Sequence, residues 1–193
     1  MPKKTAIVGV SDRWGWAVIV TVDADGTVID RRRVELVDDD LPPFPHHHEA
    51  LTLQPDEGVA LVERVRASVI RCAGARLATL AAEVATKITG IALRTCPELP
   101  PTVAERLTSY RAQNVADSVM YRDALADAAA ARGWSVSRYE ARRVVGDAAR
   151  SLGRTRIDDL LRAPGRALGP PWQQDHRLAM AAAIAATTRQ SPR

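Results

Sequence analysis

Arginine is concentrated in the C-terminal third of the chain, where it could bind phosphate groups. Eight arginines lie between Arg138 and Arg166, against four acidic residues in the same interval. This local excess of four positive charges equals the net charge of +4 for the whole protein. Guanidinium groups bind nucleic-acid phosphates without reading sequence, and such binding weakens as salt rises. The arginines that we expect to position phosphates are Arg142, Arg143, Arg150, Arg154 and Arg156.

A compositional explanation of this stretch is also open. The chain has only three lysines, so a GC-rich genome that encodes surface cations as arginine would give the same pattern. A pI near 9.5 permits an acidic partner without requiring one. The sequence therefore leaves the choice between DNA, RNA and a protein ligand open.

Two local clusters offer other chemistry. Three consecutive histidines, His46 to His48, follow a proline-rich segment. A metal site needs ligands that the backbone fixes in place, whereas consecutive side chains in a loop diverge, so we expect a solvated loop. Trp14 and Trp16 flank Gly15 and could stack on bases. Packing within a hairpin explains the two tryptophans equally well, and we favour it.

The overall composition is that of one folded domain. The chain has 193 residues, of which 46% are hydrophobic and 26% charged. No apolar run approaches the roughly 18–20 residues that a membrane helix needs, and the N-terminus lacks a signal-peptide pattern, so we expect a cytoplasmic protein that does not contact a membrane. Cys72 and Cys96 lack metal-site spacing and are expected to pack in the core. We expect one domain over residues 1–188, with a Pro/His-rich loop at 38–54 and a frayed tail at 189–193.

The hydrophobic pattern predicts an α/β fold. Apolar or alternating runs predict five strands, at 5–10, 16–22, 27–37, 88–93 and 134–139. Helical periodicity and capping signals predict helices at 55–84, 102–132, 141–152, 155–161 and 173–187. Three antiparallel strands followed by parallel βα units form a mixed five-stranded sheet with helices on both faces.

This order of elements is that of the ribonuclease H-like fold, and three stretches resemble the RuvC-type Holliday-junction resolvases. The family's first strand and turn are similar to AIVGVSDRWGWA at residues 6–17. A later glycine-containing stretch of the family resembles VVGDAAR at residues 144–150, and its closing helix resembles DHRLAMAAAI at residues 175–184. The resemblance covers both ends of the chain and implies the same fold.

The resemblance also implies a chemistry, in which clustered carboxylates hold two divalent metal ions that activate water for phosphodiester cleavage. Ser11 stands where the first-strand aspartate is expected, and a neutral hydroxyl is a poor ligand for Mg²⁺. Asp12 comes one residue later, so strand alternation turns it to the other face unless a bulge intervenes. The fourth-strand glutamate position falls within 92–95, which contains no acid. Asp175 matches the first acid of the closing helix, but Leu178 replaces the second.

We therefore expect a degenerate acidic site in a protein that binds DNA or RNA without efficient cleavage. One alternative is a structure-specific nuclease with a displaced ligand set for Mg²⁺ or Mn²⁺, drawn from Asp12, Glu98, Asp117, Asp175 and His176. In that alternative Asp175 and Asp12 are the catalytic candidates, and Asp175 with His176 are the metal-ligand candidates. A second alternative is a structural protein-interaction domain. The resemblance to dimeric resolvases also implies a homodimer.

Overall fold

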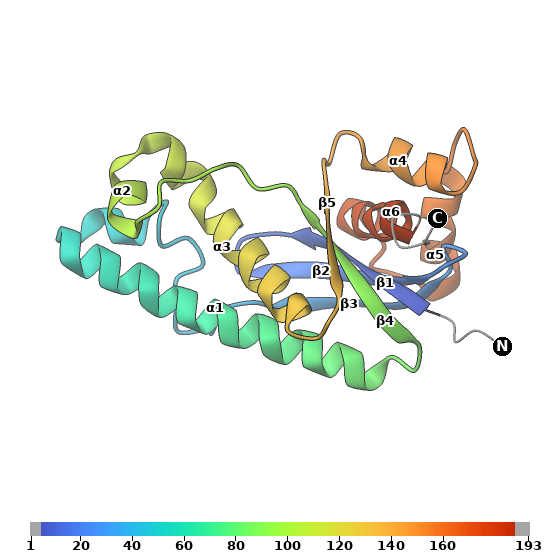
Figure 1. The fold of residues 1–193 in the computed structure, drawn as a ribbon, viewed down its shortest axis with the longest axis horizontal. Helices are drawn as coiled ribbons and strands as arrows, with labels where there is room; N and C mark the ends of the chain where they lie inside the picture. Colours follow the sequence, from blue (N-terminus) through green and yellow to red (C-terminus); the bar gives the residue numbers. More distant parts are fainter. Residues whose placement is uncertain (1–4, 188–193) are drawn as a thin grey trace.

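The computed structural model describes residues 5–187 and contains a five-stranded mixed sheet (Figure 1). Its strands are β1 (Thr5–Asp12), β2 (Trp16–Asp23), β3 (Val28–Glu35), β4 (Lys87–Arg94) and β5 (Ser135–Tyr139). They lie in the order β3-β2-β1-β4-β5. The first three strands are antiparallel, and β4 and β5 run parallel to β1. The predicted ribonuclease H-like architecture is confirmed.

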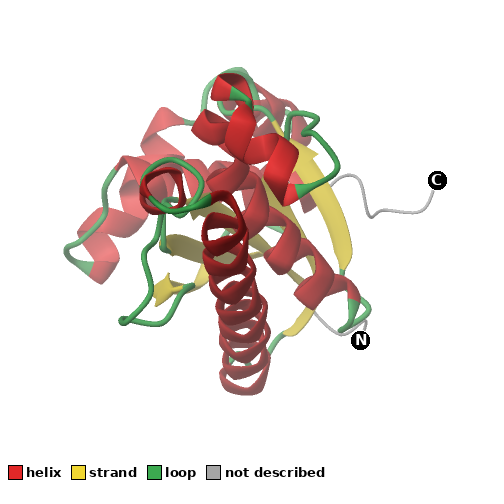
Figure 2. Ribbon diagram, turned by 90° about the vertical axis from the view of Figure 1, so that its left-hand side faces the viewer, coloured by secondary structure: helices red, strands yellow, loops and turns green. Residues whose placement is uncertain are grey.

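Helices cover both faces of this sheet, as Figures 1 and 2 show. They are α1 (Pro55–Glu83), α2 (Val103–Thr108), α3 (Tyr110–Ala130), α4 (Val144–Ser151), α5 (Asp158–Leu168) and α6 (Gln174–Thr187). Helices α1 and α3 pack together on one face, whereas α6 packs on β1 and β2 on the other face and carries α4 on its outer side. No helix within residues 5–187 is both long enough and apolar enough to cross a membrane.

The side chains of β1 alternate between the two helical layers. Val8 and Val10 belong to the core that includes α1 and α3, whereas Ile7 belongs to the core that includes α6. Gly9 lies on the α6 side, where a Cβ atom would come within 1.8 Å of the carbonyl oxygen of Ala179. Glycine therefore lets α6 cross β1 in backbone contact, and this crossing brings the first turn of α6 to the end of β1.

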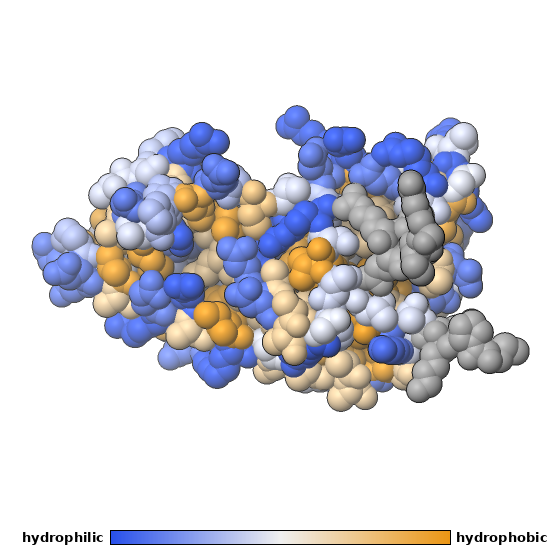
Figure 3. Space-filling view, in the orientation of Figure 1, coloured by the Kyte–Doolittle hydropathy of each residue, from blue (hydrophilic) through white to orange (hydrophobic). Residues whose placement is uncertain are grey.

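The parallel strands β1, β4 and β5 end at one edge of the sheet, which we call the carboxyl edge. Figure 1 shows the chain leaving β4 toward α2 and leaving β5 toward α4. Between these two departures the outline of the space-filling view is indented (Figure 3). Ligands of open α/β sheets bind outside the carboxyl ends of the strands, so a functional site is expected at this edge.

Several element ends shift by one to three residues from the sequence prediction, and three differences are larger. The predicted helix at 102–132 is two helices, because Ser109 adopts an extended conformation and its hydroxyl caps the start of α3 by accepting from the Ala112 N–H. Helix α5 runs through Pro164 to Leu168, beyond the predicted end at 161. The loop at 38–54 contains a short 3₁₀ helix at Glu49–Thr52. The predicted tail at 189–193 lies outside the described residues.

Candidate functional site

Ser11 and Asp175 meet at the carboxyl edge, on the α6 side of the sheet. Ser11 is the penultimate residue of β1 and is fully buried. Its hydroxyl donates to Oδ1 of Asp175, in the first turn of α6, over 2.9 Å. Ser11 occupies the position where the family resemblance predicts an aspartate, and it is a neutral hydrogen-bond donor there.

Arg13, the first residue after β1, donates hydrogen bonds to the same carboxylate. Its Nη2 donates to both oxygens of Asp175, at 2.9 and 3.1 Å, and its Nε donates to Oδ2 at 3.2 Å. The Arg13 side chain is 51% exposed and that of Asp175 is 15% exposed. Asp175 therefore already accepts four hydrogen bonds, one from Ser11 and three from Arg13, which is close to the capacity of a carboxylate.

Asp12 faces the opposite layer, as alternation predicts. The pairing of β1 with β2 is regular through Asp12, so no bulge reverses its direction. Its Oδ2 accepts from Nε of Arg122 in α3 at 2.9 Å, and the two side chains are only 3% and 9% exposed. Burial disfavours the charged guanidinium, but the hydrogen bond and the charge of Asp12 outweigh it and raise the pKa of Arg122. The structure does not bring Asp12 and Asp175 together.

An arginine also stands on β4 at this edge. Gly9 of β1 pairs with Ala92, which belongs to the core beneath α6, so Arg94 two residues later faces the same side as Ser11. Arg94 pairs in turn with Tyr139 of β5. Burial raises the pKa of Tyr139 to about 12, and its hydroxyl donates to the Val10 carbonyl at 2.7 Å. The fourth-strand position thus contributes a cation rather than an acid.

His176 lies next to Asp175 but is used by the fold. It is buried, its Nδ1 accepts from the Gln173 backbone N–H at 3.2 Å, and its ring packs against Trp172. Burial, and then the charge of Arg31, lower the pKa of His176, so the neutral ring is favoured. Asp175 and His176 both line a pocket of about 440 Å³ between β2, β3 and the start of α6.

Arg31 fixes the segment that leads into α6. Its guanidinium donates to the carbonyl oxygens of Leu168, Gly169 and Pro171. These bonds tie the α5–α6 connection to the edge strand β3, and so they help to hold Asp175 beside Ser11. Within residues 5–187, no three His, Cys, Asp or Glu side chains are grouped so that they could hold a metal ion.

The five predicted phosphate-binding arginines are exposed and lie around α4, where hydrophilic residues cover the surface in Figure 3. Arg150 pairs with Asp147, and Arg156 approaches Asp158 at 3.7 Å. The other three form no ion pair with any described residue: Arg142, Arg143 and Arg154. Because α4 packs on α6, these arginines belong to the same side of the molecule as Asp175.

The remaining members of the displaced ligand set lie elsewhere. Glu98 is exposed in the connection between β4 and α2. Asp117 of α3 is buried and accepts from Nδ1 of His46 at 2.7 Å. His46 was expected in a solvated loop, but it is 1% exposed, because Asp117 and the core behind it hold this part of the loop.

Sequence reasoning missed the three arginines that neutralise or replace acids at the carboxyl edge: Arg13, Arg94 and Arg122. Arg13 is two residues from Ser11 and lies within the stretch that resembles the family's first strand and turn, so its position was a usable signal. Arg94 lies in the interval already aligned with the fourth-strand acid. Arg122 is 110 residues from Asp12, and no local pattern joins them.

The mixed sheet order and the two helical layers define a ribonuclease H-like fold. Among solved structures, the chain is similar to RuvC of Thermus thermophilus. It aligns with T. thermophilus RuvC in complex with a Holliday junction substrate at a TM-score of 0.53 and 11% identity, covering 95% of this chain and 93% of that one. A second Thermus thermophilus RuvC structure aligns at 0.51 and 12% identity, with the same coverage of both chains. No protein-family model and no curated protein matches the sequence.

Proposed function

We propose that this protein is a catalytically degenerate, RuvC-like module that binds nucleic acid. One observation carries the proposal: Asp175, the acid in register with the family's closing helix, is bound by the Ser11 hydroxyl and by Nε and Nη2 of Arg13. Each of these bonds uses an oxygen lone pair that a divalent cation would need. The residues present therefore do not fit a two-metal site.

The charge at the carboxyl edge points to phosphate rather than to metal ions. Three guanidinium groups, of Arg13, Arg94 and Arg122, accompany two carboxylates, of Asp12 and Asp175. An excess of positive charge repels Mg²⁺ and attracts the phosphate backbone. Phosphate would then be bound at this edge without being hydrolysed.

The arginines around α4 extend this positive surface. Arg142, Arg143 and Arg154 are exposed and free of ion pairs with described residues, so a phosphate need not displace an acidic partner from them. Arg150 and Arg156 contribute less, because each has an aspartate beside it. The likeness to a RuvC structure that holds a Holliday junction supports a nucleic-acid ligand.

The test is a binding and cleavage assay over a salt series, with labelled single-stranded, duplex and four-way-junction DNA and RNA. We expect salt-sensitive binding without cleavage in Mg²⁺ or Mn²⁺. Each phosphate contact contributes about 0.9 to the slope of log K against log salt. The double variant Arg142→Gln/Arg154→Gln should therefore lower the magnitude of that slope by about 2.

A matched control removes two charges from the other parts of the molecule. Arg64 of α1 and Lys87, at the opposite end of β4 from the carboxyl edge, are both exposed. The variant Arg64→Gln/Lys87→Gln should keep the wild-type slope. An equal loss in both double variants would show non-specific attraction and contradict the proposed surface.

The alternatives predict other outcomes of the same assay. Cleavage that requires Mn²⁺ and is lost in Asp175→Ala would establish a nuclease with a displaced ligand set. A protein that binds none of the nucleic acids would be assigned to partner interaction instead. Light scattering on the same samples tests the homodimer that the RuvC likeness suggests.

A further inference from the structure

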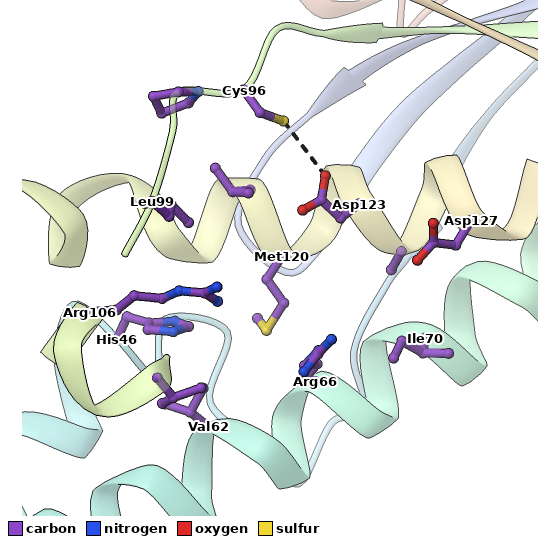
Figure 4. A pocket seen from close by; sticks show the side chains of 14 residues that line it. His46, Val62, Arg66, Ile70, Cys96, Leu99, Arg106, Met120, Asp123 and Asp127 are labelled. Carbon is purple, nitrogen blue, oxygen red and sulfur yellow. Dashed lines mark hydrogen bonds between the residues drawn. The ribbon is translucent and has the colours of Figure 1, made fainter. Parts of the chain in front are cut away.

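A pocket of about 330 Å³ lies on the other face of the sheet from Asp175, between α1, α2, α3 and the connection after β4. Figure 4 shows the side chains that line it, which come from all of these segments. Its volume is at the lower end of the range for small-molecule sites. None of the residues proposed above for nucleic-acid binding lines this pocket.

His46 presents a buried, unused nitrogen to this pocket. Asp117 accepts from Nδ1 of His46 at 2.7 Å and from the backbone N–H groups of His46 and His47 at 3.1 and 3.2 Å. A carboxylate only accepts, so Nδ1 carries a proton, and Nε2 is the ring nitrogen that this contact leaves for a ligand. That Nε2 atom is buried and has no hydrogen-bonding partner among the described residues, although His46 lines the pocket.

A buried nitrogen without a partner lowers the stability of the fold unless a ligand hydrogen-bonds to it. A buried polar group without a partner destabilises the fold by the free energy of its lost hydration. Asp117 also fixes the ring in one orientation, so Nε2 is a preorganised acceptor. The pocket therefore favours a ligand that has a hydroxyl or N–H group to donate there.

Two arginines in the same lining provide the complementary charge. The guanidinium of Arg106 is held in place, because Nε donates to the Pro100 carbonyl at 2.7 Å and Nη2 to the Pro101 carbonyl at 3.2 Å. Its Nη1 has no hydrogen-bonding partner among the described residues. Arg66 of α1 is exposed and lines the pocket as well. In Figure 4 both guanidinium groups extend from their helices toward Met120.

The acids of the pocket limit the charge of the ligand. Asp123 and Asp127 of α3 line it too, and Arg66 lies 3.6 Å from Glu63 of its own helix, so carboxylates surround the two guanidinium groups. Asp123 also lies 3.6 Å from Arg138. A doubly charged phosphate ester would be repelled by these acids, whereas a single carboxylate is not penalised to the same degree. Val62, Val119 and the other apolar lining residues would contact a hydrocarbon body.

From these contacts we propose that the pocket binds a small organic monocarboxylate that also carries a hydroxyl or N–H donor. The carboxylate binds Arg66 and Arg106, the donor binds Nε2 of His46, and the hydrocarbon part packs on Val62, Val119 and Met120. This site is separate from the proposed nucleic-acid surface, and neither proposal depends on the other.

The probes are the three isomers of hydroxybenzoate, which differ in the distance between the acid and the hydroxyl. Titration calorimetry, together with NMR of the His46 ring protons, should show saturable binding of at least one isomer. Three analogues of that isomer define the chemistry: benzoate lacks the donor, the hydroxybenzamide lacks the charge, and phenyl phosphate carries the second charge. Each should bind about tenfold more weakly or worse.

Variants then assign the contacts. Arg66→Gln changes an exposed side chain and should weaken the bound isomer about tenfold, because one charge-assisted contact is lost. Arg64→Gln, on the same helix but outside the pocket, should leave it unchanged. His46→Gln should abolish the preference for the hydroxyl-bearing probe, provided that circular dichroism shows the fold is retained.

Two results would overturn the proposal. One is the absence of saturable binding by all three hydroxybenzoates to the wild-type protein. The other is binding that Arg66→Gln leaves intact or that the neutral amide matches. Both results leave the salt-dependent nucleic-acid assay unaffected, so the two proposals fail independently.

Discussion

Two aspartate–arginine pairs lie close to the end of β1, on opposite faces of the sheet. Asp12 and Arg122 are almost completely buried between the strand and α3. Asp175 and Arg13 lie on the α6 side, where half of the arginine side chain is in solvent. The chemical groups and the hydrogen-bond lengths are alike, so the surroundings set the difference between the pairs.

The two pairs differ in how much stability the protein loses when the arginine is removed. A buried carboxylate that loses its partner is left charged in a medium that solvates it poorly. The Asp12–Arg122 pair is therefore needed for the stability of the fold. Asp175 is 15% exposed and its partner Arg13 is 51% exposed, so water can take the place of Arg13 beside it. The Asp175–Arg13 pair is a surface contact at the carboxyl edge, because half of the Arg13 side chain is in solvent.

The largest effect is expected from Arg122→Ala. It leaves Asp12 buried and without its partner, and it removes the bond from Nη1 to the Thr95 carbonyl. Breaking one side of a buried ion pair costs about 3–5 kcal/mol of unfolding free energy. Urea unfolding followed by circular dichroism measures this loss.

A double variant separates charge from packing in the same pair. Asp12→Leu/Arg122→Met removes both charges while it keeps most of the apolar volume. Because buried pairs can be replaced by packed hydrophobic groups at little cost, the double variant should be more stable than Arg122→Ala alone. If both variants lose the same stability, packing rather than an unpaired charge holds α3 against β1.

Arg13→Ala, the matching change on the other face, should have a much smaller effect. Exposed ion pairs contribute about 0–1 kcal/mol, and the Ser11 hydroxyl still donates to Asp175 in this variant. The same urea titration measures the difference. A loss comparable to that of Arg122→Ala would contradict the distinction between a structural and a surface pair.

The sequence predicts where the two aspartates lie but neither of their arginine partners. The alternation of β1 places Ser11 and Asp12 on opposite faces, and the resemblance of residues 175–184 to the closing helix places Asp175 near Ser11. The five strands follow from apolar or alternating runs. These features depend on local patterns, which a single sequence contains.

Partners across the fold are the part that could not be predicted. Arg122 reaches Asp12 because α3 packs across the end of β1, and nothing near either residue indicates this contact. His46 is similar, since three consecutive histidines in a loop suggest solvent until Asp117 is placed behind the first of them. Long-range pairs of this kind depend on how the layers pack, which periodicity does not specify.

The smallest expected effect is on the pH dependence of the unfolding free energy, and it tests His176 on the α6 side of the sheet. Burial and the charge of Arg31 lower the pKa of His176 in the folded protein, whereas in the unfolded chain it returns to about 6.5. The unfolded state then binds the proton more readily, so stability is unaffected above about pH 6.5 and falls as the pH drops from there toward the lowered folded pKa. His176→Gln removes this contribution. The wild-type protein should therefore lose more stability than the variant between pH 7 and pH 5, as measured by urea unfolding at each pH. Parallel pH profiles would show that the ring of His176 is freely protonated in the fold, and that Arg31 and the α5–α6 connection do not shield it.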